Sequence, residues 1–444
     1  MHPIDFIPSS ALFRLMDLPN ELIKLVCSHA DLSVYDLMAL RRTCKLTREF
    51  SSDEFARRCF HSITVLIARS SLLAFIELSQ HPRFGPFIQC INISPTIASE
   101  EGLKVLPPAT APHRHGVPVP LAFQRVEDFI LDVQCMDTMR TYLNRLREEN
   151  ELKTDGSAEQ MLNIAFKAFA ERKQDIRLSF SDQETNAVGA KHLLPNRDFG
   201  ERTVWHLEWK ETIARTIKAA FKQGCTIVEI ALHETGRKDA QNNSSCCTDD
   251  IEQELASVRA QLTCLTVDFE HRDIETTSRS IERMVSAVKD LSWLYLHQIG
   301  EFDDSNQRYM PEILDCVAAT SLEQMSLGYC RMSQSQLTAF IEKHSATLHD
   351  LQLHEACLIT GSCMSLIAWI KDNLPCLKYL ELDGMCEHGN KTTCDGDAFK
   401  SYWVGYGKEK DVQVSPANML DGKYDHETVV EEYNELVGMN TKDE

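Results

Sequence analysis

The chain has 444 residues, of which 46 are Lys or Arg and 66 are Asp or Glu, so its formal net charge is −20. At about 150 residues per domain, this length predicts two or three domains. A hydrophobic content of 43% with 25% charged residues is typical of a globular protein. The acidic balance argues against nucleic acid as a partner and against adsorption to an anionic membrane.

The N-terminal residues MHPIDFIPSSALFRLMDLPNEL lack the basic region and the unbroken apolar run of a secretory signal peptide. No stretch of the sequence reaches the roughly 20 apolar residues that a membrane span needs. The 16 cysteines are scattered, and without a secretory signal we expect reduced thiols buried as small apolar groups. We therefore expect a cytoplasmic or nuclear protein with no membrane partner.

Residues 14–62 carry the pattern of short helices. Leu18-Pro19-Asn20-Glu21-Leu22 opens the first helix, where Pro19 fixes the entry and Glu21 suits the N-terminal turn. Ser33, with Asp36 three residues later, predicts the start of a second helix. Helices this short bury little apolar surface, so a partner commonly completes such a module.

This segment resembles the F-box, the adaptor-binding module of Skp–cullin–F-box ubiquitin ligases. The Leu-Pro-x-Glu-Leu motif of that family corresponds to residues 18–22, and its Leu-Arg-x-x-Cys-Lys pattern corresponds to residues 40–45. The resemblance implies docking on a Skp-family adaptor and, through it, on a cullin. The adaptor-binding residues expected on the matching positions are Leu18, Pro19, Leu22, Ile23, Val26, Leu37, Leu40, Arg41 and Cys44.

Two positions depart from the F-box pattern. Thr47 stands where the family usually has an aromatic residue, and Phe55 or Phe60 replaces the downstream Trp. These departures would weaken adaptor binding without abolishing docking. They also leave open an amphipathic helical hairpin that caps the rest of the fold and binds no adaptor.

Two ranges follow this module. Residues 63–134 contain an expected helix at Ser70–Ser79 and a Pro-rich loop at Ser94–Pro120. Helical patterns at Met136–Glu149 and Ala158–Arg172 predict that residues 135–224 form a helical insertion.

The C-terminal half contains a repeated pattern, apolar-x-x-apolar-x-apolar, at start-to-start spacings of 26 to 31 residues. A helical pattern separates each copy from the next, so each repeat predicts one strand and one helix. Looser copies begin at Ile88, Val126 and Cys225. The five regular copies begin at Leu262, Leu291, Leu322, Leu348 and Leu377.

The segments LEQMSLGYCRM and LHDLQLHEACL resemble the leucine-rich repeat family. The fold class that this resemblance implies is α/β, with a small helical N-terminal F-box followed by a leucine-rich-repeat solenoid that has parallel strands on its concave face and helices outside. The alternative is an ordinary doubly wound α/β domain with leucine-rich strands. The predicted domains are adaptor-binding helices (14–62), an N-terminal cap with the first degenerate repeats and a Pro-rich loop (63–134), a helical insertion (135–224), leucine-rich repeats (225–383) and an acidic C-terminal extension (384–444).

The sequence contains no motif of a catalytic site. It has no Gly-rich phosphate loop followed by Lys-Ser/Thr, no Gly-x-Ser-x-Gly and no His-Glu-x-x-His. Cys386, His388 and Cys394 would supply three metal ligands, but they lack the paired Cys-x2–4-Cys of structural zinc sites. We expect no enzyme activity, no cofactor and no metal.

Side chains alternate between the two faces of a strand, so the residues between the leucines of each copy point away from the helices. Over the eight copies these are 24 positions, of which seven are Asp or Glu and none is Lys or Arg. They indicate either a solvated acidic surface or a face that binds a basic, partly extended segment. The expected target-binding residues are Asp268, Trp293, Tyr295, His297, Asp350, Gln352, His354, Tyr379, Glu381 and Asp383.

The combined patterns predict a non-catalytic substrate-recognition subunit of a Skp–cullin–F-box ubiquitin ligase. Its partners would be a Skp-family adaptor, a cullin and an unknown target protein. One alternative is a leucine-rich-repeat scaffold that binds proteins independently of a ubiquitin ligase. Another is an α/β enzyme with an unrecognised site, against which the missing motifs count.

Overall fold

The structure is a computed structural model. It describes residues 18–97, 140–141, 143–152, 154–181, 187–189, 206–207, 209–233, 261–270, 274–299, 309–383, 385–387 and 404–406.

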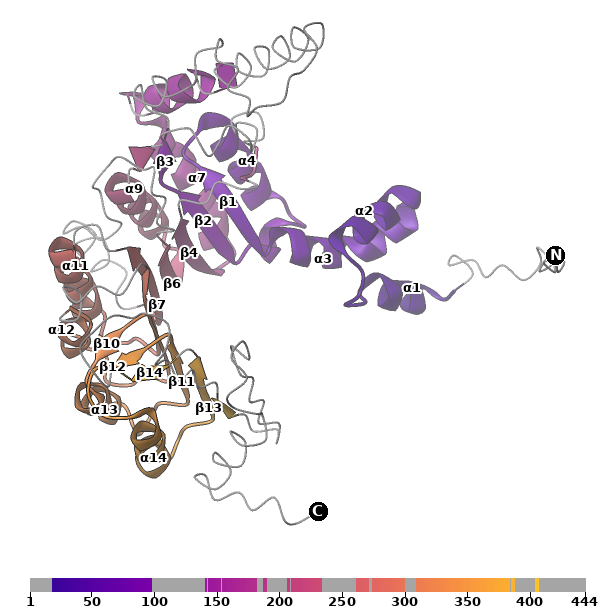
Figure 1. The fold of residues 1–444 in the computed structure, drawn as a ribbon. Helices are drawn as coiled ribbons and strands as arrows, with labels where there is room; N and C mark the ends of the chain where they lie inside the picture. The colour runs from indigo at the N-terminus through magenta and orange to yellow at the C-terminus, as the bar shows by residue number, and fades with distance from the viewer. Residues whose placement is uncertain are drawn as a thin grey trace, which may run out of the picture.

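Three helices form the N-terminal module, α1 (Asn20–Cys27), α2 (Val34–Thr43) and α3 (Lys45–Phe60), and they project from the rest of the molecule (Figure 1). The expected helix start at Ser33 is present, because its hydroxyl accepts from the Asp36 N–H while the Asp36 carboxylate accepts from the Ser33 N–H. The small core of the module contains Ile23, Cys27 and Leu37, which are fully buried.

One sheet of ten strands dominates the fold, and its strand order is the same as the chain order. Nine strands are parallel, and the last strand pairs antiparallel at the edge. Its strands are β1 (Ser62–Leu66), β2 (Cys90–Ser94), β4 (Asp175–Ser181), β6 (Thr226–His233), β7 (Cys264–Glu270), β8 (Trp293–Ile299), β9 (Gln324–Gly328), β11 (Asp350–His354), β13 (Tyr379–Asp383) and β15 (Val404–Tyr406).

Two small sheets accompany the main one. The first contains three short parallel strands that follow β9, β11 and β13 along the chain. The second is an antiparallel pair. Their strands are β10 (Arg331–Met332), β12 (Cys357–Leu358) and β14 (Cys386–Glu387), and then β3 (Thr96–Ile97) and β5 (His206–Leu207).

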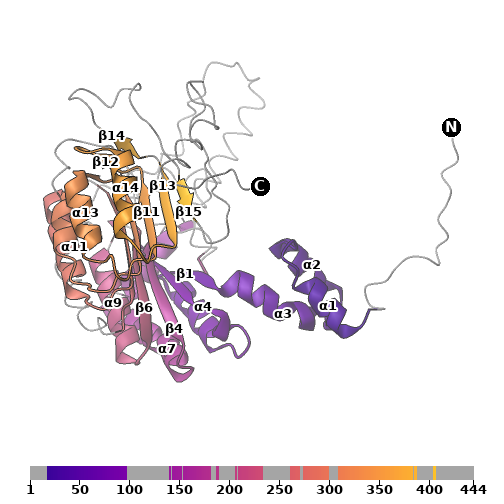
Figure 2. The ribbon, with the colours of Figure 1, turned by 90° about the horizontal axis from the view of Figure 1, so that it is seen from below.

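Helices follow most strands, and α9, α11, α13 and α14 lie on one side of the sheet (Figures 1 and 2). Capping boxes at Ser333 and Ser362 start α13 and α14 where the sequence predicts helices. The helices of this part of the chain are α4 (Arg69–Gln80), the 3-10 turn η3 (Gly85–Phe87), α7 (Ser157–Glu171), α9 (Trp209–Lys222), α11 (Ile274–Ala287), α12 (Tyr309–Asp315), α13 (Gln334–Glu342) and α14 (Cys363–Asn373).

A continuous apolar core lies between the sheet and these helices. Alternate residues of every long parallel strand are buried in it, such as Leu294 and Leu296 of β8 and Leu351 and Leu353 of β11. Burying one such side chain stabilises the fold by about 1.5–3 kcal/mol. The opposite positions of the same strands therefore form the second face of the sheet.

The structure corrects the predicted fold class. It is an α/β fold built on one open sheet with nine parallel strands, and the predicted leucine-rich-repeat solenoid is wrong. The connections between neighbouring strands differ widely in length, so the strands do not follow a constant repeat unit. β1 ends at Leu66 and β2 begins at Cys90, whereas β2 ends at Ser94 and β4 begins only at Asp175. A leucine pattern indicates strands whose apolar side chains are buried. Such strands occur in parallel α/β sheets of every kind and not only in leucine-rich repeats. The pattern thus located strands without defining the fold class.

Two details of the sheet differ from the sequence-based expectations. Residues 135–224, predicted as a helical insertion, also supply β4, which pairs with β2 and β6 in the main sheet. A bulge opposite Ile176 and Arg177 shifts the register of β6, so Ile227, expected to point outward, is buried in the core. The copy that begins at Val126 lies outside the described residues, as does most of 384–444.

Among the described residues, no helix is both long and apolar enough to cross a membrane.

Candidate functional site

The structure divides the predicted adaptor-binding residues into two groups. Leu22 and Val26 on α1 are 45% and 39% exposed. Ile23 and Leu37, two further predicted contact residues, are fully buried and form part of the core of the module. The sequence reasoning missed Leu25, which is 63% exposed, although it lies one helical turn from Leu22.

The remaining predicted adaptor residues lie near the junction of α2 and α3 or before α1. Leu18, Leu40, Arg41 and Cys44 are half-buried, and Pro19 is exposed. The Arg41 guanidinium donates to the Ser52 hydroxyl, and the Cys44 sulfur accepts from the Thr47 N–H at the start of α3.

Thr47 and Phe55, which depart from the F-box pattern, have roles inside the module. Thr47 is buried, and its hydroxyl donates to the Leu40 carbonyl at 2.7 Å. The Arg41 guanidinium lies over the Phe55 ring, with its Cζ 4.3 Å from the ring centroid. These contacts hold α2 on α3, so Thr47 supports the module from within.

The predicted target-binding residues lie together on the second face of the sheet. Strands β7, β8, β9, β11 and β13 pair in register, so their outward positions form three rows. The ten predicted residues lie on four of these strands, β7, β8, β11 and β13. The rows are Cys264, Trp293, Gln324, Asp350 and Tyr379; Thr266, Tyr295, Ser326, Gln352 and Glu381; and Asp268, His297, Gly328, His354 and Asp383.

A cluster centred on His297 occupies the middle of this face. The Tyr295 hydroxyl lies 2.7 Å from His297 Nδ1, and their rings stack with centroids 3.9 Å apart. The Ser326 hydroxyl lies 3.4 Å from Nε2 of the same ring, and His354 meets it edge-on at 5.5 Å. Burial lowers the pKa of His297 to about 4, so this imidazole is neutral at pH 7.

Two carboxylates of the face have polar partners on neighbouring groups. Nδ1 of His233, at the end of β6, lies 2.6 Å from an oxygen of Asp268. The Tyr379 hydroxyl donates to the Glu381 carboxylate at 2.8 Å. Burial raises the pKa of Tyr379 to about 12, and the Glu381 carboxylate adds to this rise.

The Asp350 carboxyl accepts from the Gln352 side-chain amide at 3.1 Å. Burial raises the pKa of Asp350, and the nearby Glu381 charge adds to this rise. Asp350 and Glu381 therefore lie close enough to repel one another.

Strand β4, which the sequence did not reveal, adds a basic residue beyond these five strands. Arg177 pairs with Glu229 of β6, and its Nε lies 3.4 Å from that carboxylate. The outward side of the sheet therefore includes a basic residue outside the 24 positions counted from the sequence.

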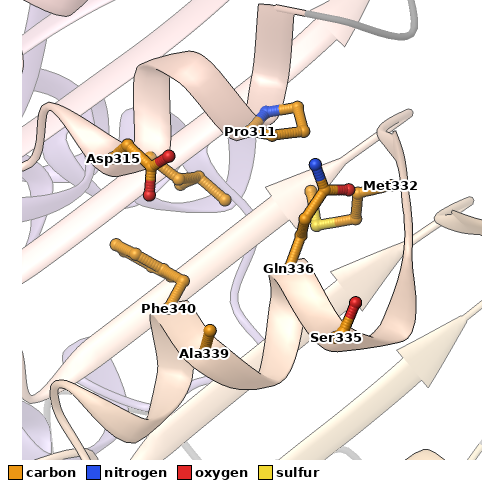
Figure 3. A pocket seen from close by; sticks show the side chains of 8 residues that line it. Pro311, Asp315, Met332, Ser335, Gln336, Ala339 and Phe340 are labelled. Carbon is orange, nitrogen blue, oxygen red and sulfur yellow. The ribbon is translucent and has the colours of Figure 1, made fainter.

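A hollow of about 240 Å³ lies on the helical side, between α12 and α13 (Figure 3). Asp315 and Phe340 line it together with Pro311, Met332 and Gln336. The carboxylate of Asp315 pairs with the Lys343 ammonium at 3.6 Å. Ser335 also lines the hollow, and its hydroxyl lies 3.0 Å from the Ser333 hydroxyl, which is not a base that would activate it.

Metal ligands do not converge in the part of the chain that the structure describes, where no group of three or more His, Cys, Asp or Glu side chains has suitable geometry. His388 and Cys394, two of the three candidate ligands from the sequence, lie outside that part.

The chain matches no family model and no curated protein. Among solved structures it is similar to tryptophan synthase from M. tuberculosis in an open form, with 12% identity over 74% of this chain and 92% of that chain and a TM-score of 0.21. A second structure of the Mycobacterium tuberculosis enzyme has 11% identity over 77% and 93% of the two chains and a TM-score of 0.23. At these TM-scores neither a fold family nor an activity can be transferred to this chain.

Proposed function

We propose that the protein is a non-catalytic substrate-recognition subunit of a Skp–cullin–F-box ubiquitin ligase, acting in the cytoplasm or the nucleus. The observation that supports this proposal is the exposed apolar face of α1, formed by Leu22, Leu25 and Val26 on a small projecting module. Exposed aliphatic side chains that gather on one short helix are typical of a surface that a partner covers.

In this proposal, the module docks on a Skp-family adaptor and the sheet face holds a target protein. The protein itself breaks and forms no bond. It holds a lysine of the target near a ubiquitin-carrying enzyme on the cullin, which converts a bimolecular encounter into a local one.

A second candidate is a protein-binding scaffold that acts without a ubiquitin ligase. The burial of Ile23 and Leu37 favours it, because two of the nine expected adaptor contacts are already used in the core of the module. Both candidates use the same sheet face, and they differ in what α1 binds.

Co-purification with the adaptor distinguishes the two candidates. Leu22→Ala combined with Val26→Ala removes exposed side chains and leaves the module core intact. We expect adaptor capture to fall by about tenfold or more, because burying a Leu or Val side chain contributes about 1.5–3 kcal/mol and 1.4 kcal/mol corresponds to a tenfold change in affinity. The matched control is Leu73→Ala with Ile164→Ala, two exposed aliphatic residues on α4 and α7.

The control pair should capture the adaptor as the parent does. If Leu22→Ala with Val26→Ala captures it equally well, or if the parent captures none, the ubiquitin ligase proposal is wrong and the scaffold takes its place.

A further inference from the structure

The outward face of β7, β8, β9, β11 and β13 is acidic. On these five described strands, the outward positions include Asp268, Asp350, Glu381 and Asp383, and none is Lys or Arg. His297 is neutral at pH 7 and therefore adds no positive charge to this face. Arg177, on the distant β4, is already paired with Glu229.

Further acidic and aromatic groups lie at the edge of this face. Tyr329, directly after β9, donates to the Glu355 carboxylate at 3.2 Å. The charges of Glu355 and Asp383 both act on the Tyr329 hydroxyl, so the two carboxylates lie near the same group. Trp293 on β8 is 43% exposed, and its indole face is a surface on which a guanidinium stacks.

We propose that this face binds a Lys- or Arg-rich, extended segment of a partner protein, with basic side chains at Asp350, Glu381 and Asp383 and a guanidinium over Trp293. The charge complementarity of the face selects such a segment and rejects a phosphorylated segment or a nucleic acid, each of which needs Lys or Arg on the receptor. Five strands at about 4.8 Å spacing span about 19 Å, which about six extended residues cross.

This inference names the target class of the proposed function and rests on it only for the fate of the bound partner. Peptide binding itself can be measured without an adaptor. The probe is a labelled ten-residue peptide of alternating Arg and Thr, with a peptide of alternating Glu and Thr as its counterpart. Binding to the full chain is followed by fluorescence anisotropy at low and raised salt.

The test variant is Asp350→Asn with Glu381→Gln and Asp383→Asn, which keeps side-chain size and removes three charges. The matched control is Glu312→Gln with Glu342→Gln and Asp372→Asn, which removes three exposed charges from α12, α13 and α14 on the helical side. We expect the test variant to bind the basic peptide about tenfold more weakly, as three partly exposed ion pairs imply.

The control variant should bind as the parent does, and raised salt should weaken parent binding. Equal loss in both triple variants, salt-insensitive binding, or tighter binding of the Glu peptide would overturn the inference. Adaptor capture by the test variant separates the two proposals: retained capture with unchanged peptide binding refutes only the basic-segment inference.

Discussion

The substitution Gly328→Ala tests the packing of the His297 cluster. A Cβ atom added at Gly328 would lie 2.5 Å from Cγ and Nε2 of His297, far inside van der Waals contact. The imidazole cannot yield freely, because it stacks on Tyr295 and meets His354 at its edge. The position thus requires glycine because the neighbouring ring fills the space of a side chain.

The expected cost has two parts. Moving the ring lengthens the 2.7 Å contact between Tyr295 and His297, and a net hydrogen bond contributes about 1 kcal/mol. Forcing a methyl group into a filled site costs about 1–3 kcal/mol. We expect the free energy of unfolding to fall by about 2–4 kcal/mol, measured by urea denaturation with the slope unchanged.

A double-mutant cycle isolates the cause. In a His297→Ala background the space is empty, so Gly328→Ala should cost little, and the coupling energy should be about 2–3 kcal/mol. An equal cost in both backgrounds would show that the loss comes from the backbone of β9 and that the ring does not set the requirement for glycine.

Two more predictions concern a core histidine and β4. His344 is buried against Phe340, and among the described residues neither of its ring nitrogens has a hydrogen-bond partner. Burial lowers its pKa, so the unfolded chain binds the proton more readily and stability is lost as the pH falls below about 6.5. His344→Phe should therefore lose less unfolding free energy than the parent between pH 7 and pH 5, and an equal loss would contradict this. Phe180→Ala in β4 should lower the free energy of unfolding by about 3–5 kcal/mol in urea denaturation, because Phe180 is fully buried. A loss below about 1 kcal/mol would show that β4 does not pack in the core.

The sequence predicted the strands of the C-terminal half because their leucines alternate with polar residues. It missed β4 because Ile176, Leu178 and Phe180 do not fit the leucine spacing, and the long interval before this strand suggested an insertion. The error in the fold class has the same origin, since a local pattern reports the burial of a strand and says nothing of how strands are connected.

The candidate surfaces were predictable to different degrees. Alternation along the strands is a rigid geometric rule, so the ten predicted face residues lie together on one face. The rule fails in β6, where a bulge before Glu229 leaves Ile227 in the core. In the N-terminal module the motif could not separate core from surface, because Leu22 and Ile23 are adjacent apolar residues on a helix. Only the packing of α1 on its neighbours decides that Ile23 points inward and Leu22 outward.

The attachment of the module to the sheet bears on the proposed function. A receptor that acts by proximity must hold its two binding surfaces in a fixed relation, because a loose link lowers the effective concentration of the target. Helix α3 ends at Phe60, two residues before β1, and the Phe60 ring packs on Phe84 with centroids 4.9 Å apart. Arg83, beside that ring, donates to the Glu49 carbonyl at 3.0 Å and lies 3.1 Å from the Asp53 carboxylate.

These contacts bring the loop after α4 against the middle of α3, so the module is fixed at two places along its longest helix. A hairpin that only covered the end of the sheet would need its apolar surface turned toward the sheet. Here Leu22, Leu25 and Val26 remain exposed while polar and aromatic groups make the attachment. That division of roles supports a module that is held rigidly by one surface and offers another to a partner.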